Sequence, residues 1–281
     1  MYDLALLAPG LERGADGIWR ARQRSGIDYP DGANGFCYQM EEHSFWFNHR
    51  NRCIVEAVRN YPPSGPIADI GAGNGYVALA LQRAGFEVLV MEPGLAGARN
   101  AQSRGLDPVV CATLEDADLR PHSLAAAAVF DVIEHFADEV AFLQLLHRSL
   151  RPNGRLYLTV PAYLALWSNE DDVAGHHHRY TLGRLRTRLA RAGFVVEYAT
   201  YFFGPLPLPV YIFRTLPSRL GRRPPPNRAQ AAAELNPSSG VALRTISSLL
   251  HVEAALIKRR LRIPTGTSCL VTARATEIPA A

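Results

Sequence analysis

Apolar and polar positions change their spacing several times along this chain of 281 residues. Short apolar runs, which are typical of buried strands, alternate with segments in which apolar residues recur every three or four positions, as on one face of a helix. This alternation predicts an α/β fold, a parallel sheet with helices on both faces. Strands are expected at 66–70, 87–91, 109–113, 124–130, 155–160, 194–201 and 268–273, and helices at 41–60, 75–85, 95–104, 139–150, 182–192 and 241–261.

The pattern divides the chain into three parts. Residues 1–60 comprise an arm of weak periodicity, expected to be irregular over 1–35, and then a helix rich in aromatic residues. Residues 61–202 together with 267–281 are expected to form the α/β domain. Residues 203–266 are rich in proline and arginine and are partly helical in pattern. We expect them to be an insertion ahead of the last strand, serving as a lid, a docking surface or an oligomer contact.

Composition excludes several classes of protein. With 48% apolar and 20% charged residues, the chain is typical of a globular protein and not of a disordered or fibrous one. The four cysteines include no CxxC pair, which argues against a zinc knuckle or a disulfide framework and favours the reducing cytoplasm. The first residues lack the pattern of a signal peptide, and no apolar run reaches the roughly 20 residues of a membrane span. We expect a cytoplasmic protein without a bound metal.

Charge is unevenly distributed along the chain. The whole chain carries +4, whereas residues 203–266 contain ten Arg and Lys against two Glu and carry +8, so the remainder is mildly acidic. An aromatic and proline-rich run at 201–213 precedes the arginines. This pairing suits a peripheral contact with an anionic membrane at the inner face, a lid over an apolar acceptor, or a homodimer contact. No nucleic-acid-binding motif is recognisable, and we expect no nucleic-acid partner.

A glycine-rich turn is the strongest chemical signal. Asp69-Ile-Gly71-Ala-Gly73-Asn-Gly75 lies between an expected strand and an expected helix, where glycine lets the backbone turn tightly and approach a ligand closely. The helix N-terminus that follows favours a negatively charged group. Glu92 ends the next strand, where a carboxylate can bind the two hydroxyls of a ribose. These residues predict a site for an adenosine-containing cofactor at the carboxyl edge of the sheet.

The same turn resembles motif I of the class I S-adenosylmethionine-dependent methyltransferases, whereas nicotinamide enzymes usually carry GxGxxG without the leading acid. The resemblance continues through Val90-Met-Glu92-Pro, Phe130-Asp-Val-Ile-Glu-His135-Phe and Leu150-Arg-Pro-Asn-Gly154. It covers roughly residues 40–200 and the last strand. It implies a Rossmann-like, doubly wound sheet of seven strands, mostly parallel with an antiparallel last strand. It also implies that S-adenosyl-L-methionine is the cofactor and S-adenosyl-L-homocysteine the product.

The resemblance implies a set of cofactor contacts. The leading acid and the glycines would line the methionine and ribose part, the acid after the second strand would hold the ribose diol, and the residues after the third strand would flank the adenine. The residues that end the fourth strand would lie beside the amino-acid end of the cofactor and the acceptor. These residues are Asp69, Gly71, Gly73, Gly75, Glu92, Thr113, Leu114, Phe130 and Asp131.

The acceptor side is less determined by the sequence. Methyl transfer depends mainly on alignment, and a general base helps a hydroxyl more than a neutral amine, so an oxygen and a nitrogen acceptor both remain open. His135, His176 and His178 are candidate bases because imidazole titrates near neutral pH. His176 and His178 belong to a His-His-His-Arg-Tyr-Thr segment. The alternative interpretation is that this segment is simply a polar loop ahead of a helix capped by Thr181. A similar segment after Trp-Ser-x-x-Asp occurs in a subset of bacterial relatives, which implies a role at the acceptor.

Four further residues are expected to bind the acceptor, a small or lipid-linked molecule. Arg179 and Tyr180 suit an anionic group, and Trp167 lies in the same region of the sequence. Trp46 belongs to a Phe-Trp-Phe-x-x-Arg segment that resembles a cofactor-covering helix; it would wall the site or merely pack the helix onto the sheet. Two rival interpretations stay open: an NAD(P)-dependent oxidoreductase, and a non-catalytic cofactor-binding scaffold that docks through 203–266.

Overall fold

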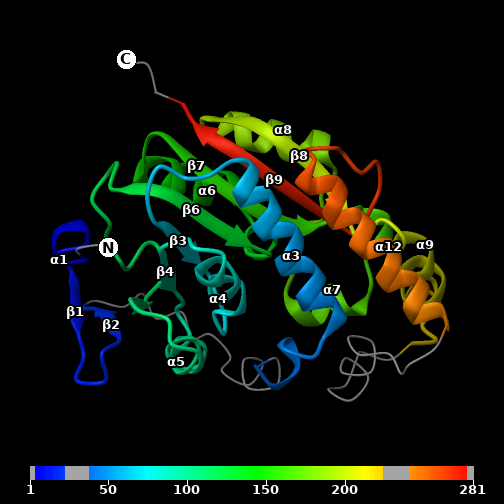
Figure 1. The fold of residues 1–281 in the computed structure, drawn as a ribbon, viewed down its shortest axis with the longest axis horizontal. Coiled ribbons are helices and arrows are strands. Elements are labelled where there is room, and N and C mark those ends of the chain that lie inside the picture. Colours follow the sequence, from blue (N-terminus) through cyan, green and yellow to red (C-terminus); the bar gives the residue numbers. More distant parts are fainter. Residues whose placement is uncertain (1–3, 23–37, 224–240, 277–281) are drawn as a thin grey trace.

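A single mixed sheet runs through the protein in a computed structural model that describes residues 4–22, 38–223 and 241–276 (Figure 1). The backbone alone is described for 241–247. The strands lie in the order β1-β2-β5-β4-β3-β6-β7-β9-β8. Their bounds are β1 Leu11–Arg13, β2 Trp19–Ala21, β3 Ile67–Ile70, β4 Val88–Met91, β5 Val109–Cys111, β6 Leu124–Phe130, β7 Leu150–Pro161, β8 Phe194–Phe202 and β9 Ser268–Ala275.

Seven of these strands form the sheet that the resemblance implies. β5, β4, β3, β6 and β7 pair in parallel, and β9 lies antiparallel between β7 and β8. Every residue of β3, β4 and β6 is buried, because helices cover both faces of a parallel sheet. The α/β fold, the mostly parallel sheet and the antiparallel last strand are therefore confirmed.

The N-terminal arm differs from its expected irregular structure. β1 and β2 form an antiparallel hairpin, and β2 pairs in parallel with β5, so the sheet has nine strands rather than seven. Each of these two strands is three residues long and buries one residue, Leu11 or Ala21. So short a run has no period to detect in the sequence; the pairing with β5 decides its structure.

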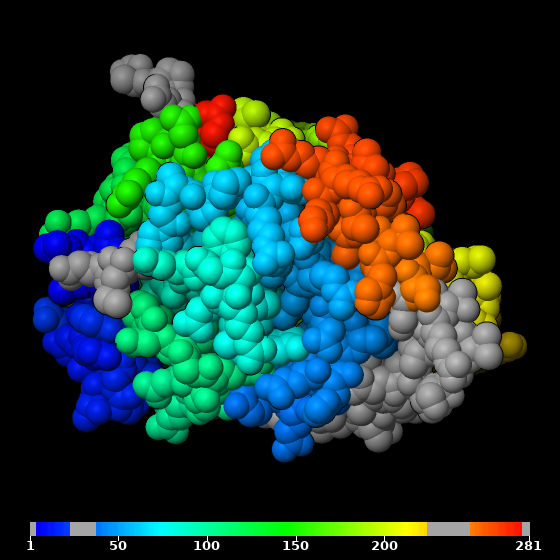
Figure 2. Space-filling view, in the orientation of Figure 1, coloured from blue at the N-terminus to red at the C-terminus, as the bar shows by residue number. Residues whose placement is uncertain are grey.

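Helices cover the sheet in two layers (Figure 1). α3, α4, α5 and α12 bury their apolar faces on one side, and α6 and α8 on the other. Figure 2 shows α12, which comes from the expected insertion, lying along α3. The helices are α1 Leu4–Leu7, α3 Phe45–Asn60, α4 Tyr76–Arg83, α5 Leu95–Ser103, α6 Glu139–Ser149, α7 Asn169–Ala174, α8 Leu182–Arg191, α9 Pro207–Val210, α10 Leu216–Arg219 and α12 Val241–Lys258, with short turns η1 Ile133–His135, η2 Leu164–Leu166 and η3 Tyr211–Thr215.

The described part of the chain contains no helix that is both long and apolar enough to cross a membrane. Cys53, Cys111 and Cys269 are buried free thiols, while Cys37 lies outside the described residues. The parallel strands β3, β4, β6 and β7 all end at one edge of the sheet. The loops that follow these strands therefore meet there, and they bring the glycine-rich turn close to the end of β6.

Candidate active site

A cavity of about 1030 Å³ opens at the carboxyl edge of the sheet. Its wall is built from segments far apart in the sequence: the start of α3, the glycine-rich turn, the end of β6 with η1, the α7 region, and residues 206–223. Of the residues expected in the site, the wall includes Trp46, Asp69, Gly71, Gly73, Phe130, Asp131, His135, His176 and Arg179.

The glycine-rich turn forms one end of this cavity. Gly71, Gly73 and Gly75 all have positive φ, at 72°, 56° and 72°, a conformation that side chains with a Cβ adopt at a cost. A Cβ on Gly75 would lie 2.6 Å from Leu106 and 2.8 Å from Ala101, so this glycine lets α4 pack closely on α5. A Cβ on Gly73 would meet nothing within 4 Å, so its backbone is open to the cavity. The two glycines thus serve packing and ligand approach respectively.

Asp69 lies beneath the turn, 1% exposed. Its Oδ2 has no hydrogen-bond partner among the described residues. Burial raises the pKa of Asp69 to about 7; Arg50 opposes this shift and Glu92 adds to it. A buried carboxyl with an unpaired oxygen costs stability, and a cationic group bound in the cavity would relieve that cost.

Glu92, at the end of β4, joins the turn to the neighbouring strand. Its Oε2 accepts a hydrogen bond from the backbone N–H of Gly73 at 2.8 Å, and its Oε1 accepts one from Gly94 at 2.9 Å. Gly75 and Glu92 are not themselves part of the cavity wall, and two other expected cofactor residues also lie away from it. Leu114 is buried in the core, and Thr113 accepts a hydrogen bond from Asp116 N–H through its Oγ1.

An ion pair lies in the cavity wall. Nη2 of Arg50 lies 2.7 Å from Oδ2 of Asp131 and donates a hydrogen bond to the carbonyl of Phe130 at 3.0 Å. The guanidinium also lies over the ring of Trp46, with 5.4 Å from its central carbon to the ring centroid. Asp131 itself adopts a positive φ of 57°. This pair fixes α3 against the end of β6.

A buried carboxylate organises the opposite end. Asp171 is fully buried and accepts hydrogen bonds from Nδ1 of His176 at 2.9 Å and from Nε of Arg179 at 2.7 Å. Burial alone would raise the pKa of Asp171, but these two hydrogen bonds outweigh it and hold the pKa below its ordinary value. Asp171 is therefore ionised, so the proton of His176 lies on Nδ1 and Nε2 is left for the cavity.

Two further titratable groups lie beside His176. The ring of His135 is 4.9 Å from that of His176, and surrounding protein atoms together with His176 lower its pKa. Glu134 is fully buried at the cavity wall, and neither carboxyl oxygen has a hydrogen-bond partner in the described part of the chain. Burial, and then the charge of Asp131, raise its pKa well above the ordinary value. Glu134, His135 and His176 bring their ligand atoms within 4.8 Å of one another, close enough to hold a cation.

Three residues expected at the acceptor lie elsewhere. His178 turns to α6, with Nε2 3.1 Å from Oε2 of Glu139. The Tyr180 ring is fully buried in the core. Nε1 of Trp167 donates to Asp172 at 3.0 Å, and the ring is not part of the cavity wall. The structure thus separates His176 from His178, two residues that the sequence presents as equivalent.

Residues 206–223 close the same end of the cavity. Leu206, Pro209, Val210 and Phe213 supply apolar wall, and Arg214 and Arg223 supply charge. Both arginines pair with Glu170, at 3.0 Å and 2.6 Å. Sequence reasoning missed this cluster, since more than 40 positions separate the acid from its partners and no local motif joins them.

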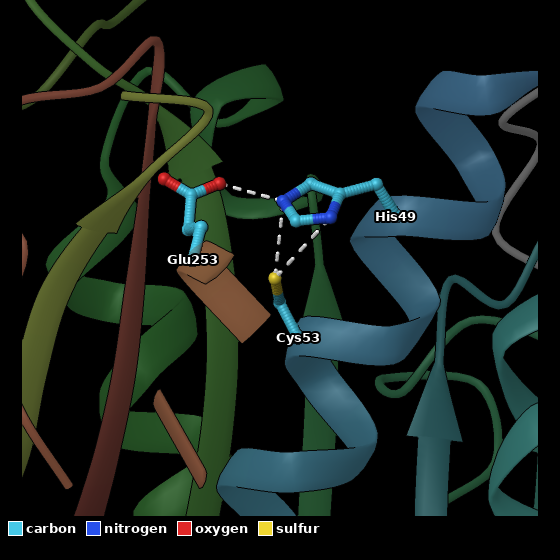
Figure 3. Close-up of side chains that lie close together, drawn as sticks. All are labelled: His49, Cys53 and Glu253. Carbon is cyan, nitrogen blue, oxygen red and sulfur yellow. Dashed lines mark hydrogen bonds and ion pairs between the residues drawn. The ribbon is translucent and has the colours of Figure 1, made fainter. Parts of the chain in front are cut away.

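A second buried cluster fixes the helix that carries Trp46. Figure 3 shows Glu253 of α12 reaching His49 of α3, with its Oε2 2.6 Å from Nε2 of His49 and Cys53 close by. The same carboxylate accepts hydrogen bonds from the backbone N–H groups of Phe203 and Gly204 at 2.8 Å. The Phe203 ring stacks on Trp46, with 5.4 Å between centroids and 6° between planes. Glu253 thereby couples α12 to the aromatic wall; His49, Cys53 and Glu253 also lie close enough to hold a cation.

Comparisons with known proteins identify the family of the chain. Residues 43–199 match the family model described as a methyltransferase domain. The chain is 28% identical over 120 residues to the human mitochondrial ubiquinone biosynthesis O-methyltransferase, a match covering 38% of this chain and 32% of the relative. It is 25% identical over 170 residues to a probable S-adenosylmethionine-dependent methyltransferase of Mycobacterium tuberculosis, covering 59% of this chain and 62% of that one. The chain therefore spans about a third and about three fifths of the two relatives.

A solved structure supports the fold. The S-adenosylmethionine-dependent methyltransferase of Thermotoga maritima superposes with a TM-score of 0.53 at 16% identity, covering 86% of this chain and 99% of that one. At this identity, the likeness concerns the fold alone.

Proposed function

This chain belongs to the class I S-adenosylmethionine-dependent methyltransferases, and from that premise we propose that it transfers a methyl group from S-adenosyl-L-methionine to a hydroxyl oxygen of a small or lipid-linked acceptor. The observation that favours an oxygen acceptor over a nitrogen acceptor is the hydrogen bond between Nδ1 of His176 and the buried Asp171. It leaves Nε2 to accept a proton at the cavity, which a hydroxyl acceptor needs and an amine that arrives neutral does not.

The residues at the glycine end fit the cofactor. Gly73 offers open backbone, and Glu92 accepts the hydrogen bond of the Gly73 N–H; this contact next to the open backbone supports a role for Glu92 at the ribose diol. The unpaired oxygen of Asp69 suits the ammonium group of the methionine part. When bound, S-adenosyl-L-methionine supplies a methyl group already activated on a positively charged sulfur. We assign Asp69, Gly71, Gly73 and Glu92 to holding it.

The chain's own residues have three tasks at the other end. Asp171 keeps His176 in one tautomer and one orientation, so Nε2 can take the proton of the acceptor hydroxyl. His135 lies against the same ring, and its lowered pKa keeps it neutral near pH 7, so it does not repel the imidazolium that forms. Trp46 and Val210 line the cavity, where they exclude water and contact the apolar part of the acceptor.

The O-methyltransferase name of the human relative agrees with an oxygen acceptor, although the match covers 38% of this chain. The oxidoreductase alternative is disfavoured by family membership. The scaffold alternative differs in one respect, since it predicts cofactor binding without turnover.

Calorimetry with S-adenosyl-L-homocysteine, followed by transfer of a labelled methyl group to phenolic and aliphatic hydroxyl acceptors, tests the proposal. His176→Gln is expected to lower turnover by about a hundredfold or more with the affinity for S-adenosyl-L-homocysteine unchanged. His178→Gln is the matched control and should keep turnover near that of the parent. Equal losses in the two variants, or none in either, would eliminate His176 as the base.

A further inference from the structure

The outer face of the segment that closes the cavity is apolar. α9, η3 and α10 follow one another without a break from Pro207 to Arg219. Phe213 is 73% exposed and Leu208 is 67% exposed, values that are high for apolar side chains gathered on one short helical segment. The exposed apolar residues of the segment, hereafter the apolar face, are Leu208, Tyr211, Ile212, Phe213, Leu216 and Leu220.

Positive charge borders the apolar face. Residues 203–223 contain four arginines and neither Asp nor Glu. Two of the arginines turn inward to Glu170, whereas Arg219 and Arg222 are exposed. Arg219 also donates to the carbonyls of Leu164 and Ala165, which holds the exposed side chain of Leu164 beside the segment. Apolar side chains with flanking cations complement an anionic phospholipid surface.

A second copy of the chain fits this face less well. A twofold contact sets the same patch against itself, so Arg219 and Arg222 of both copies would approach one another without any acid in the segment to pair with them. Phosphate headgroups supply the missing negative charge, and the acyl region accepts the apolar side chains.

The segment also belongs to the cavity. Leu206, Pro209 and Val210 face the cavity, and the exposed Phe213 lies at its wall as well. The helical segment that presents the apolar face to the outside therefore lines the same cavity as His176. An acceptor with a polar end and a long apolar chain could place the first at His176 and leave the second along this segment.

We propose that residues 206–222 dock the cavity mouth on an anionic phospholipid bilayer, and that the methyl acceptor is a lipid that enters the cavity directly from that bilayer. The docking is inferred only from the apolar face and from Arg219 and Arg222 beside it. The nature of the acceptor rests in addition on the proposed methyl transfer.

Co-sedimentation with vesicles tests the docking. The parent protein is expected to sediment with vesicles of phosphatidylcholine and phosphatidylglycerol, and more weakly with phosphatidylcholine alone or at high salt. The double variant Leu208→Ser, Ile212→Ser should partition about tenfold or more weakly. The matched control is Leu6→Ser, Val195→Ser, which removes two exposed apolar side chains outside the segment and should behave as the parent.

Three results would overturn the docking. The first is that the parent does not sediment with anionic vesicles at low salt. The second is that the two double variants behave alike. The third is that the parent forms a dimer in solution, the Leu208→Ser, Ile212→Ser variant is a monomer, and vesicles bind neither of these two proteins. Calorimetry with S-adenosyl-L-homocysteine on the same proteins keeps the two proposals separate. Parent and variants should bind it equally, because these side chains lie outside the cavity wall. Failure of the parent to bind it would count against the methyltransferase function and not against the docking.

A photoreactive lipid tests entry from the bilayer. A long-chain alcohol with a diazirine next to its hydroxyl group, dissolved in the same vesicles, is expected to label cavity residues such as Val210 or His176. Excess S-adenosyl-L-homocysteine should leave this labelling in place. Labels confined to Leu208 and Ile212 on the outer face would overturn entry of the acceptor while leaving the docking intact.

Discussion

The two ends of the cavity are built in different ways. At the glycine end, backbone conformation and strand ends form the site, and three glycines with positive φ lie within five residues of one another. At the acceptor end, side chains from α7, the loop after it and residues 206–223 are held together by one buried ion pair and two partly buried ones. A substitution that adds a methyl group should therefore disrupt the glycine end most, and a substitution that removes a charge should disrupt the acceptor end most.

Asp171→Ala should have the largest effect on stability. It leaves Arg179 buried without its carboxylate and removes the partner of His176, so the free energy of unfolding is expected to fall by about 3–5 kcal/mol. Urea denaturation measures this loss. Asp172→Ala, an exposed neighbour in the same helix, is the control. If the two variants lose the same amount, Asp171 does not organise the acceptor end.

Gly75→Ala tests the glycine end by adding one methyl group. Its positive φ and the contacts with Leu106 and Ala101 predict a loss of about 2–4 kcal/mol in the free energy of unfolding. Gly73→Ala should cost only about 1–2 kcal/mol, for its φ alone, because its Cβ would stand in open space. Calorimetry should nevertheless show that Gly73→Ala weakens the binding of S-adenosyl-L-homocysteine more, relative to its loss of stability, than Gly75→Ala does. The reverse order in stability would contradict the separate roles of the two glycines.

Asp69→Asn should stabilise the protein and weaken cofactor binding. The folded-state pKa of about 7 lies above the ordinary value of 3.8, so the folded state binds more protons between these values, and stability falls as the pH rises through this range. The full penalty is present above pH 7, where the variant should gain about 1–3 kcal/mol in the free energy of unfolding. Thermal denaturation across this pH range measures the gain. A parent protein whose stability is flat from pH 4 to 7 would refute the raised pKa.

Tyr180→Phe is expected to have the smallest effect. The hydroxyl group of Tyr180 is buried with no hydrogen-bond partner among the described residues, so its removal should leave stability unchanged or raise it by about 1 kcal/mol. Turnover and the Michaelis constant for the acceptor should both stay at the parent values, because the ring lies in the core. A raised Michaelis constant would restore Tyr180 to the acceptor site that the sequence suggests.

The same contrast explains how much of the site could be predicted. Asp69 and the glycines follow from a local motif, because their roles depend on the backbone of one turn between a strand and a helix. The candidates His176 and His178 look alike in sequence, and only the packing of their loop sends one to Asp171 and the other to Glu139. Glu170 with its two arginines and Glu253 with His49 join positions too distant for any pattern to connect.

The sequence by itself determined the alternating strands and helices and the glycine-rich turn, because apolar periodicity and glycine conformation are local properties of the chain, and the family resemblance added the antiparallel last strand. Only the tertiary structure decided that the N-terminal arm adds two strands, since a three-residue strand exists through its pairing partner. It also decided which histidine faces the cavity and that the basic, apolar segment forms part of the cavity wall. These features depend on contacts between segments that are distant in the sequence, and such contacts form only in the folded chain.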